Sequence, residues 1–251
     1  MKRTSKTVPW LLDGERFPAV SSAWGANDPA PGLLAAGSAL DAQSLVRAYR
    51  AGIFPWFSLG QPILWWSPNP RMVLKTSHFK LHRSLKKTLL RFMQTTNCDV
   101  RFDRAFDQVI TACANAPRDG QTGTWIVPEM IAAYNNLHKT GHAHSVETWV
   151  NGELVGGLYC VNLGSMVFGE SMFALQTDAS KIALAALVAF CKAKGISTID
   201  CQQNTQHLSS FGASEISRED FTAHLSQYID NPAPEWIFET PYWDEILKNH
   251  D

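Results

Sequence analysis

Hydrophobic residues recur with two periods along the chain, and each period predicts a different kind of element. Apolar positions at helical spacing predict five helices, over residues 42–51, 78–92, 103–114, 128–137 and 181–194. Strand-like patterns, with Asn151-Gly152 as a hairpin turn, predict four strands, over residues 144–150, 154–161, 165–171 and 197–202. The resulting β-β-β-α-β order with antiparallel strands predicts an α+β, acyltransferase-like domain.

The segment over residues 52–70 fits neither pattern. It carries four prolines and three tryptophans, so it is too broken for a helix and too apolar for a linker. Its rings either form a small aromatic core under loops or offer flat faces on which an unpaired nucleobase stacks. We predict a small N-terminal domain with Trp/Pro-rich loops over residues 1–70 and a second domain over residues 71–251.

The formal net charge of the 251-residue chain is only −1, but the charges are segregated along it. Residues 1–98 carry +9 and residues 99–251 carry −10, and no acidic residue occurs from Ala42 to Cys98. A nearly neutral protein with this distribution still presents a strong local field to a polyanion.

A predicted basic helix, over residues 78–92, lies within the acid-free stretch. Its basic residues share one face or lie beside it: Lys80, Arg83, Lys86, Lys87 and Arg91. Like charges on one helix face repel each other, so contact with a phosphate backbone explains this stripe better than a solvated surface does.

Targeting and cysteine features exclude other classes of protein. The first twenty residues carry Asp13 and Glu15 without the apolar core of a signal peptide, and no apolar run is long enough to cross a bilayer. The five cysteines include no CxxC pair, which argues against a disulfide framework and a zinc ribbon. We expect a cytoplasmic protein without membrane contact, and a monomer because no heptad pattern occurs.

Three polar residues stand out among the apolar strands. Asp200 and Gln202 are two positions apart on one predicted strand and therefore share a face, and Glu170 lies on another strand. Gly156-Gly157 on a third strand indicates close approach by a ligand or by another backbone. An acid beside an amide in such surroundings can bind a cationic amine and hold it near a carbonyl.

Other candidate chemistries are weaker. His138, His142 and His144, with Glu147, could be metal ligands, but no second cluster supports them, so we predict no metal site. The segment from Phe173 to Ser180 lacks the Gly-rich turn that cradles a pyrophosphate, which disfavours acyl-CoA as a donor. A nucleophilic Cys201 is disfavoured because the neighbouring carboxylate opposes formation of a thiolate.

Seven segments of the sequence resemble, in the same order, the segments of one known protein family. They are AYRAGIFPWF (48–57), PILWWSPNPR (62–71), GTWIVPEMIAAY (123–134), GHAHSVETW (141–149), LVGGLY (154–159), GESMF (169–173) and IDCQ (199–202). Together they resemble the bacterial leucyl/phenylalanyl-tRNA–protein transferase family. The resemblance implies transfer of Leu or Phe, and weakly of Met, from aminoacyl-tRNA to the N-terminal Arg or Lys of a protein, which creates a degradation signal. It also implies a small N-terminal domain joined to an acetyltransferase-like (GNAT-type) domain.

The resemblance also implies a role for each matching residue. The residues that it assigns to the aminoacyl-adenosine end of the tRNA are Trp56 and Trp125. The active-site polar groups are Glu170, Asp200 and Gln202, and the apolar pocket for the Leu or Phe side chain includes Met172, Ile199 and Cys201. The residues that it assigns to contact with the acceptor stem, on the basic helix, are Arg83, Lys86 and Lys87.

The chain departs from the family pattern at a few positions. Asn204 lies one position early, so it receives no role; Gly37-Ser38-Ala39-Leu40 stands in place of GGDL, and Cys160 replaces a usual Gly.

The donor ester is already activated, so we expect neither a cofactor nor a covalent intermediate, and catalysis by positioning. We expect Asp200 to bind the acceptor's α-ammonium as a base or an electrostatic anchor, and Gln202 to orient the amine or the carbonyl. Glu170 recognises either the acceptor's cationic side chain or the donor's α-amine. Two alternatives remain: a noncatalytic module for single-stranded RNA and a small-molecule N-acetyltransferase.

Overall fold

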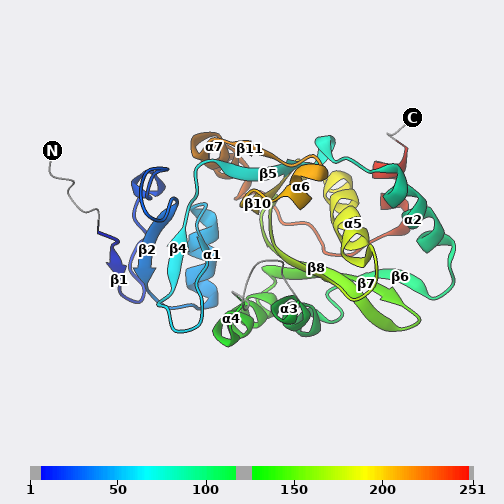
Figure 1. Ribbon diagram of the computed structural model, residues 1–251, viewed down its shortest axis with the longest axis horizontal. Helices are drawn as coiled ribbons and strands as arrows, with labels where there is room; N and C mark the ends of the chain where they lie inside the picture. The colour runs from blue at the N-terminus through cyan, green and yellow to red at the C-terminus, as the bar shows by residue number, and fades with distance from the viewer. Residues whose placement is uncertain (1–6, 117–125, 249–251) are drawn as a thin grey trace.

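The computed structural model describes residues 7–116 and 126–248, which form two β-sheets with helices packed around them (Figure 1). The smaller sheet has the strand order β1-β2-β4-β3. Its strands are β1 Trp10–Leu11, β2 Leu33–Gly37, β4 Leu64–Trp66 and β3 Phe54–Pro55. The outer strands β1 and β3 are only two residues long, so the two exposed edges offer few unpaired backbone groups.

The larger sheet has the order β11-β5-β10-β9-β8-β7-β6 and carries the long strands. These are β11 Ser214–Ile216, β5 Arg71–Lys75, β10 Thr198–Gln202, β9 Met166–Ala174, β8 Glu153–Leu163, β7 Ala143–Val150 and β6 Cys98–Phe102. Only β9 and β10 pair in parallel; the other neighbours in this sheet are antiparallel. The α+β class expected from the sequence is confirmed.

The hairpin between β7 and β8 shows why the sequence folds this way locally. Val150 pairs with Glu153, and Asn151 and Gly152 between them both have positive φ, at 54° and 81°. Both central residues of a two-residue type I′ turn need this conformation, which Asn-Gly adopts readily. The predicted turn is confirmed, and it sets the register between β7 and β8.

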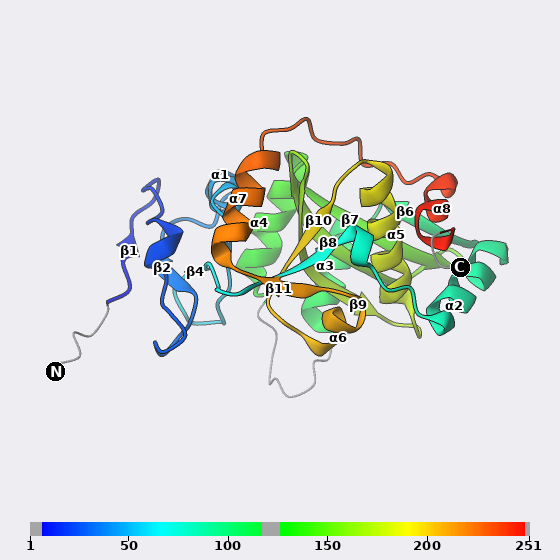
Figure 2. The same cartoon turned by 90° about the horizontal axis from the view of Figure 1, so that it is seen from above.

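Helices cover both faces of the larger sheet (Figures 1 and 2). Helix α5, Ala179–Ala193, packs on one face with the core cluster that contains Val167 and Ile199. On the other face lie α1 Ala42–Arg50, α3 Phe106–Asn115 and α4 Pro128–Lys139. The remaining helices are η1 Val20–Ser22, η2 Thr76–His78, α2 Arg83–Gln94, α6 Gln206–Ser210, α7 Arg218–Tyr228, η3 Thr240–Trp243 and α8 Asp244–Leu247.

One hydrophobic cluster continues from the smaller sheet into the larger one. It includes Leu34 and Trp65 of the smaller sheet, Met130 of α4 and Tyr159 of β8. Helix α1 lies between the two sheets in Figure 1 and contacts α4. The predicted domain boundary at residue 70 falls between β4 and β5 and stays a prediction.

The basic helix begins at Arg83, not at residue 78 as the sequence predicted. Phe79 and Leu81 are buried while Lys80 between them is exposed, so this stretch alternates like a strand. The Lys80 N–H donates to the Phe211 carbonyl, which holds the chain extended. Lys80 therefore does not belong to the helical stripe.

Two other element boundaries differ slightly from the predictions. Strand β9 continues to Ala174, three residues beyond its predicted end, and α5 begins at Ala179, two residues early. Among the described residues, no helix is both long and apolar enough to cross a membrane.

Candidate active site

Two β-bulges lie next to each other where β9 and β10 diverge. On β9, Gly169 and Ser171 pair with the consecutive residues Cys160 and Tyr159, so Glu170 is the extra residue. On β10, the register shifts between Asp200 and Gln202, and Gln202 has a positive φ of 63°. The parallel pairing of β9 with β10 reaches no further than Phe168 and Asp200. Bulges re-aim side chains beside active sites, and here they direct Glu170 and Gln202 toward each other.

Glu170 accepts hydrogen bonds from three side chains on three other elements. The Tyr49 hydroxyl of α1 donates to Oε1 at 2.7 Å, and the Tyr134 hydroxyl of α4 donates to Oε2 at 3.3 Å. Gln202 Nε2 of β10 donates to Oε1 at 2.7 Å. The two tyrosine hydroxyls are themselves 2.5 Å apart. The carboxylate is thus held by groups far apart in the sequence.

The surroundings of Glu170 change its acidity. Burial raises its pKa to about 7, against which the hydrogen bonds from Tyr49, Gln202 and Tyr134 act, while the charge of Asp200 adds to the rise. Burial, and then the charge of Glu170, raise the pKa of both tyrosines well above 10. The tyrosines are therefore hydrogen-bond donors at neutral pH, and the carboxyl titrates in the physiological range.

Asp200 is fully buried and forms a two-point ion pair with Arg71 of β5. Arg71 Nε donates to Oδ1 at 2.8 Å, and Nη2 donates to Oδ2 at 2.6 Å. The Gln202 backbone N–H also donates to Asp200 Oδ1, at 2.9 Å. Both carboxylate oxygens of Asp200 are therefore engaged by Arg71 and by the Gln202 backbone. The expected contact of Asp200 with the acceptor's α-ammonium stays a prediction.

The apolar residues expected to line a side-chain pocket lie on the opposite face of the sheet. Ile199 belongs to the core cluster under α5, and the half-buried Met172 and Cys201 pack against it. Met172 is two positions from Glu170, and simple alternation would place both on one face. The bulge at Glu170 reverses the alternation, so Met172 faces α5 while Glu170 faces α1 and α4.

The thiol of Cys201 is not prepared for nucleophilic attack. Burial and the charge of Asp200 raise its pKa far above the ordinary value. It is therefore a thiol at neutral pH, and a thiolate is the nucleophilic form.

The tryptophans of residues 52–70 divide into core and partly accessible rings. Trp65 is completely buried, and its Nε1 donates to the Gly37 carbonyl at 2.8 Å. Trp56 is half-buried and packs edge-on against Trp66, with 5.3 Å between ring centroids. The predicted partner of Trp56, Trp125, lies outside the described residues.

The basic helix α2 buries Leu85, Leu89 and Phe92 and presents its charges on the other side. Arg83, Lys87 and Arg91 follow at a spacing of four residues and are exposed, and Lys86 is half-buried. In the part of the chain that the structure describes, none of these side chains forms an ion pair. The stripe therefore offers uncompensated positive charge.

The histidine group considered as a metal site is held by other partners. His144 Nδ1 lies 2.7 Å from Asp103 Oδ2, and its ring stacks on Trp236 with 4.1 Å between centroids. Glu147 accepts from the Arg104 and Ala105 backbone N–H groups and from the Ser145 and Trp149 side chains. The described residues contain no group of three or more His, Cys, Asp and Glu side chains placed to hold a metal ion.

Sequence reasoning missed Arg71, Tyr49 and Tyr134. A helical tyrosine resembles an ordinary core residue, because its hydroxyl partner on another element cannot be read from spacing. Arg71 could have been noticed from the sequence, because it is a charged residue directly before three apolar residues of the strand Arg71–Lys75. Such a residue is almost never fully buried unless it is paired.

Comparisons with known proteins match nearly the whole chain to one family. The family model described as leucyl/phenylalanyl-tRNA protein transferase matches residues 73–226, and the model of its N-terminal domain matches residues 38–69. A leucyl/phenylalanyl-tRNA–protein transferase from a Polaromonas species is 64% identical over 98% of this chain and 97% of its own length. One from Albidiferax ferrireducens is 59% identical over 96% and 94%. A solved structure of FemX aligns over 81% of this chain and 70% of its own, with 11% identity and a TM-score of 0.43.

Proposed function

The chain belongs to the leucyl/phenylalanyl-tRNA–protein transferase family, and from this we propose that it transfers Leu or Phe, and weakly Met, from aminoacyl-tRNA to the N-terminal Arg or Lys of a protein. The observation that carries the proposal is the position of Glu170. Tyr49, Tyr134 and Gln202 hold this carboxylate where the β9–β10 pairing ends.

We assign Glu170 to the cationic acceptor. An ionised carboxylate beside two neutral hydroxyls attracts an ammonium or guanidinium group, and burial strengthens the attraction. The hydrogen bond from Gln202 Nε2 leaves the Gln202 Oε1 atom to accept an N–H of the attacking amine. Glu170 and Gln202 are therefore the groups that touch substrate.

Asp200 and Arg71 are positioning residues in this proposal. Asp200 holds the Gln202 backbone N–H, and Arg71 fixes Asp200. Arg71 also donates to the Gly52 carbonyl at 3.2 Å, which ties the end of the α1 segment to the site. A misplacement of Gln202 by about 1 Å costs on the order of 100-fold in rate.

The reaction needs positioning and a proton transfer. The free α-amine attacks the ester carbonyl carbon, the amide C–N bond forms, and the C–O bond to the terminal ribose breaks. The amine loses one proton and the leaving ribose oxygen gains one, so no external reagent is consumed. Holding the amine and the ester in the correct geometry can lower the barrier by about 7–11 kcal/mol.

In this proposal the donor's side chain lies on the α5 face of the sheet, and its adenosine end lies beside the smaller sheet. Met172, Ile199 and Cys201 receive the Leu or Phe side chain, and Trp56 stacks on the adenosine end. Met is transferred weakly, because apolar pockets discriminate between side chains by only about 1–3 kcal/mol per methylene. Arg83, Lys86 and Lys87 contact the phosphates of the acceptor stem.

The larger sheet supports a GNAT-type fold, because β7, β8, β9, α5 and β10 follow in the order β-β-β-α-β. Acetyl-CoA is disfavoured as a donor by the start of α5. Asp178 occupies the N-cap position, and its carboxylate accepts a hydrogen bond from Lys181 Nζ at 2.7 Å. An acid already stands where a pyrophosphate would need positive potential.

The decisive experiment compares two donors. The protein is incubated with radiolabelled Leu-tRNA and a protein that begins with Arg, and in parallel with labelled acetyl-CoA. Label transferred only from the tRNA supports the proposal. Label from acetyl-CoA indicates an N-acetyltransferase, and RNA binding without transfer indicates a noncatalytic RNA-binding module. Glu170→Gln should abolish most transfer, whereas the exposed control Glu153→Gln should not.

One copy of the chain suffices for this proposal, because a single chain supplies every side chain named in it. We therefore propose a monomer, acting in the cytoplasm where aminoacyl-tRNA is available.

A further inference from the structure

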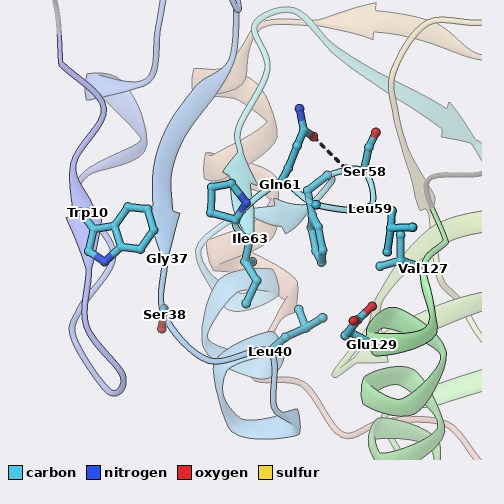
Figure 3. A pocket seen from close by; sticks show the side chains of 13 residues that line it. Trp10, Gly37, Ser38, Leu40, Ser58, Leu59, Gln61, Ile63, Val127 and Glu129 are labelled. Atoms are coloured by element: carbon cyan, nitrogen blue, oxygen red, sulfur yellow. Dashed lines mark hydrogen bonds between the residues drawn. The ribbon is translucent and has the colours of Figure 1, made fainter.

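A pocket of about 550 Å³ lies between the smaller sheet, the loop after β3 and the start of α4 (Figure 3). Its apolar lining includes Trp10, Leu40, Phe57, Leu59, Ile63 and Val127. Among the described residues that line it, Glu129 is the one ionisable side chain. None of the residues assigned to the reaction above lines this pocket.

Two features mark the pocket as a binding surface. Trp10 and Leu59 are 64% and 78% exposed, which is unusual for such large apolar side chains. Figure 3 shows Trp10 on one side of the pocket and Leu59 near Val127 on the other. The Ser38 hydroxyl also lines it, and this buried oxygen has no hydrogen-bond partner among the described residues.

The pocket is connected to the reaction site by two helices. Leu40 and Glu129 lie at the starts of α1 and α4, and the same helices carry Tyr49 and Tyr134, which hold Glu170. Tyr134 is five residues beyond Glu129, or about 7.5 Å along the helix axis. An extended peptide advances about 3.3–3.6 Å per residue, so its third or fourth residue reaches the pocket when its first is at Glu170.

Charge and position disfavour RNA as the occupant. A phosphate in the pocket would face the Glu129 carboxylate, and the lining residues that the structure describes include no cationic side chain. The basic helix α2 lies at the opposite end of the molecule from β1 and β2, as both views show (Figures 1 and 2). An acceptor stem on α2 therefore lies far from this pocket, and of the proposed donor only the adenosine end, at Trp56 beside Phe57, comes near it.

We propose that the pocket binds an apolar side chain of the acceptor polypeptide, a few residues after its N-terminal Arg or Lys. This inference rests on the proposed function, and it names a second recognition point for the same substrate. The enzyme then selects acceptors by an accessible N-terminal segment as well as by the first residue.

The test uses peptides with a fluorophore at the C-terminus and a free N-terminal Arg. One peptide has Leu at positions three and four, a second has Ser there, and a third consists of Arg and one further residue. The protein variant Leu59→Ser removes an exposed wall of the pocket. Leu175→Ser is the matched control, because Leu175 is 73% exposed and lies in the turn between β9 and α5.

We expect the wild type to bind the Leu peptide about tenfold more tightly than the Ser peptide. Leu59→Ser should remove most of this difference and raise KM for the Leu peptide with kcat unchanged, and Leu175→Ser should not. KM for the dipeptide and for Leu-tRNA should stay constant in both variants.

Equal affinity of the wild type for the Leu and Ser peptides would overturn the inference. A Leu59→Ser variant that loses affinity for Leu-tRNA instead would show that the pocket holds RNA. If the wild type transfers nothing from Leu-tRNA, the proposed function fails, but the binding comparison still decides the role of the pocket.

Discussion

Arg71 and Asp200 form an ion pair with two parallel hydrogen bonds, and their side chains are 1% and 0% exposed. The Arg71 guanidinium also lies over the rings of Phe54 and Phe221, at 4.9 and 4.5 Å from their centroids. The pair thus joins β5 and β10 of the larger sheet to a strand of the smaller sheet and to α7. Removing either charge leaves its partner buried and uncompensated.

We therefore predict that Asp200→Asn lowers the free energy of unfolding by about 3–5 kcal/mol. Each kcal/mol corresponds to a fall in Tm of about 2–4 °C for a chain of this size. Thermal unfolding measures it, with Lys248→Ala as the control, because the exposed Lys248–Asp244 pair contributes about 0–1 kcal/mol. An unchanged Tm in Asp200→Asn would show that the pair does not stabilise the fold.

The pKa of Glu170 predicts how acceptor binding depends on pH. The carboxyl ionises at about pH 7, so its attraction for a cationic N-terminal residue should increase as the pH rises through 7. KM for an Arg peptide, measured between pH 5.5 and 8.5, should fall over this interval. Glu170→Gln should bind weakly at every pH, and a step near pH 7 that persists in Glu170→Gln would assign it to another group.

The same pKa predicts the pH dependence of stability. It lies above its ordinary value of 4.5, so the folded protein holds this proton more tightly than the unfolded chain. The stabilising contribution is complete below pH 4.5 and is lost as the pH rises through 7. Urea unfolding should show less loss of stability between pH 5 and 8 in Glu170→Gln than in the wild type. Equal slopes for both proteins would contradict a raised pKa.

The Tyr49 hydroxyl should tune Glu170. Its hydrogen bond opposes the rise in the pKa of Glu170, so Tyr49→Phe should move the midpoint of the pH–KM profile to higher pH. The conservative change keeps the buried ring. In Tyr242→Phe, which removes a hydroxyl that donates to the exposed Glu239, the midpoint should stay in place. A shift to lower pH in Tyr49→Phe would refute this role.

The basic helix makes a prediction about salt. Replacing Arg83, Lys86 and Lys87 with Ala should weaken Leu-tRNA binding and reduce the slope of log K against log salt by about one for each lost phosphate contact. Transfer from a minimal aminoacyl-adenosine donor should be nearly unchanged. Arg104, Lys139 and Lys248 are three exposed basic residues outside α2, and their triple replacement is the control. Equal losses with both donors would exclude contact between the helix and the acceptor stem.

The elements that could be predicted from the sequence are those determined by local pattern. The Asn151-Gly152 turn and the predicted start of α4 at Pro128 follow from backbone preferences of single residues. The basic stretch before Arg83 was misjudged because Lys80, three positions before Arg83, fits the pattern of a helix, whereas Phe79 and Leu81 fit that of a strand. Contact with Phe211, far along the chain, decided between them.

The site could be predicted only in part, because its geometry depends on partners far apart in sequence. Glu170, Asp200 and Gln202 were recognised as polar residues in apolar strands, but alternation could not reveal the bulges that orient them. Burial of Asp200 depends on Arg71, which is 129 residues away. Local pattern therefore indicated which residues matter, while long-range contacts determined what each one touches.

The bulge at Glu170 has a consequence for how such an enzyme can change. Because it reverses the strand alternation, Glu170 and Met172 project from opposite faces of one sheet although a single residue separates them. Under the assignments proposed above, selection of the transferred amino acid and selection of the recipient protein rest on separate surfaces of the sheet. A lineage can alter one preference by substitution while leaving the other intact, so the two specificities should evolve independently.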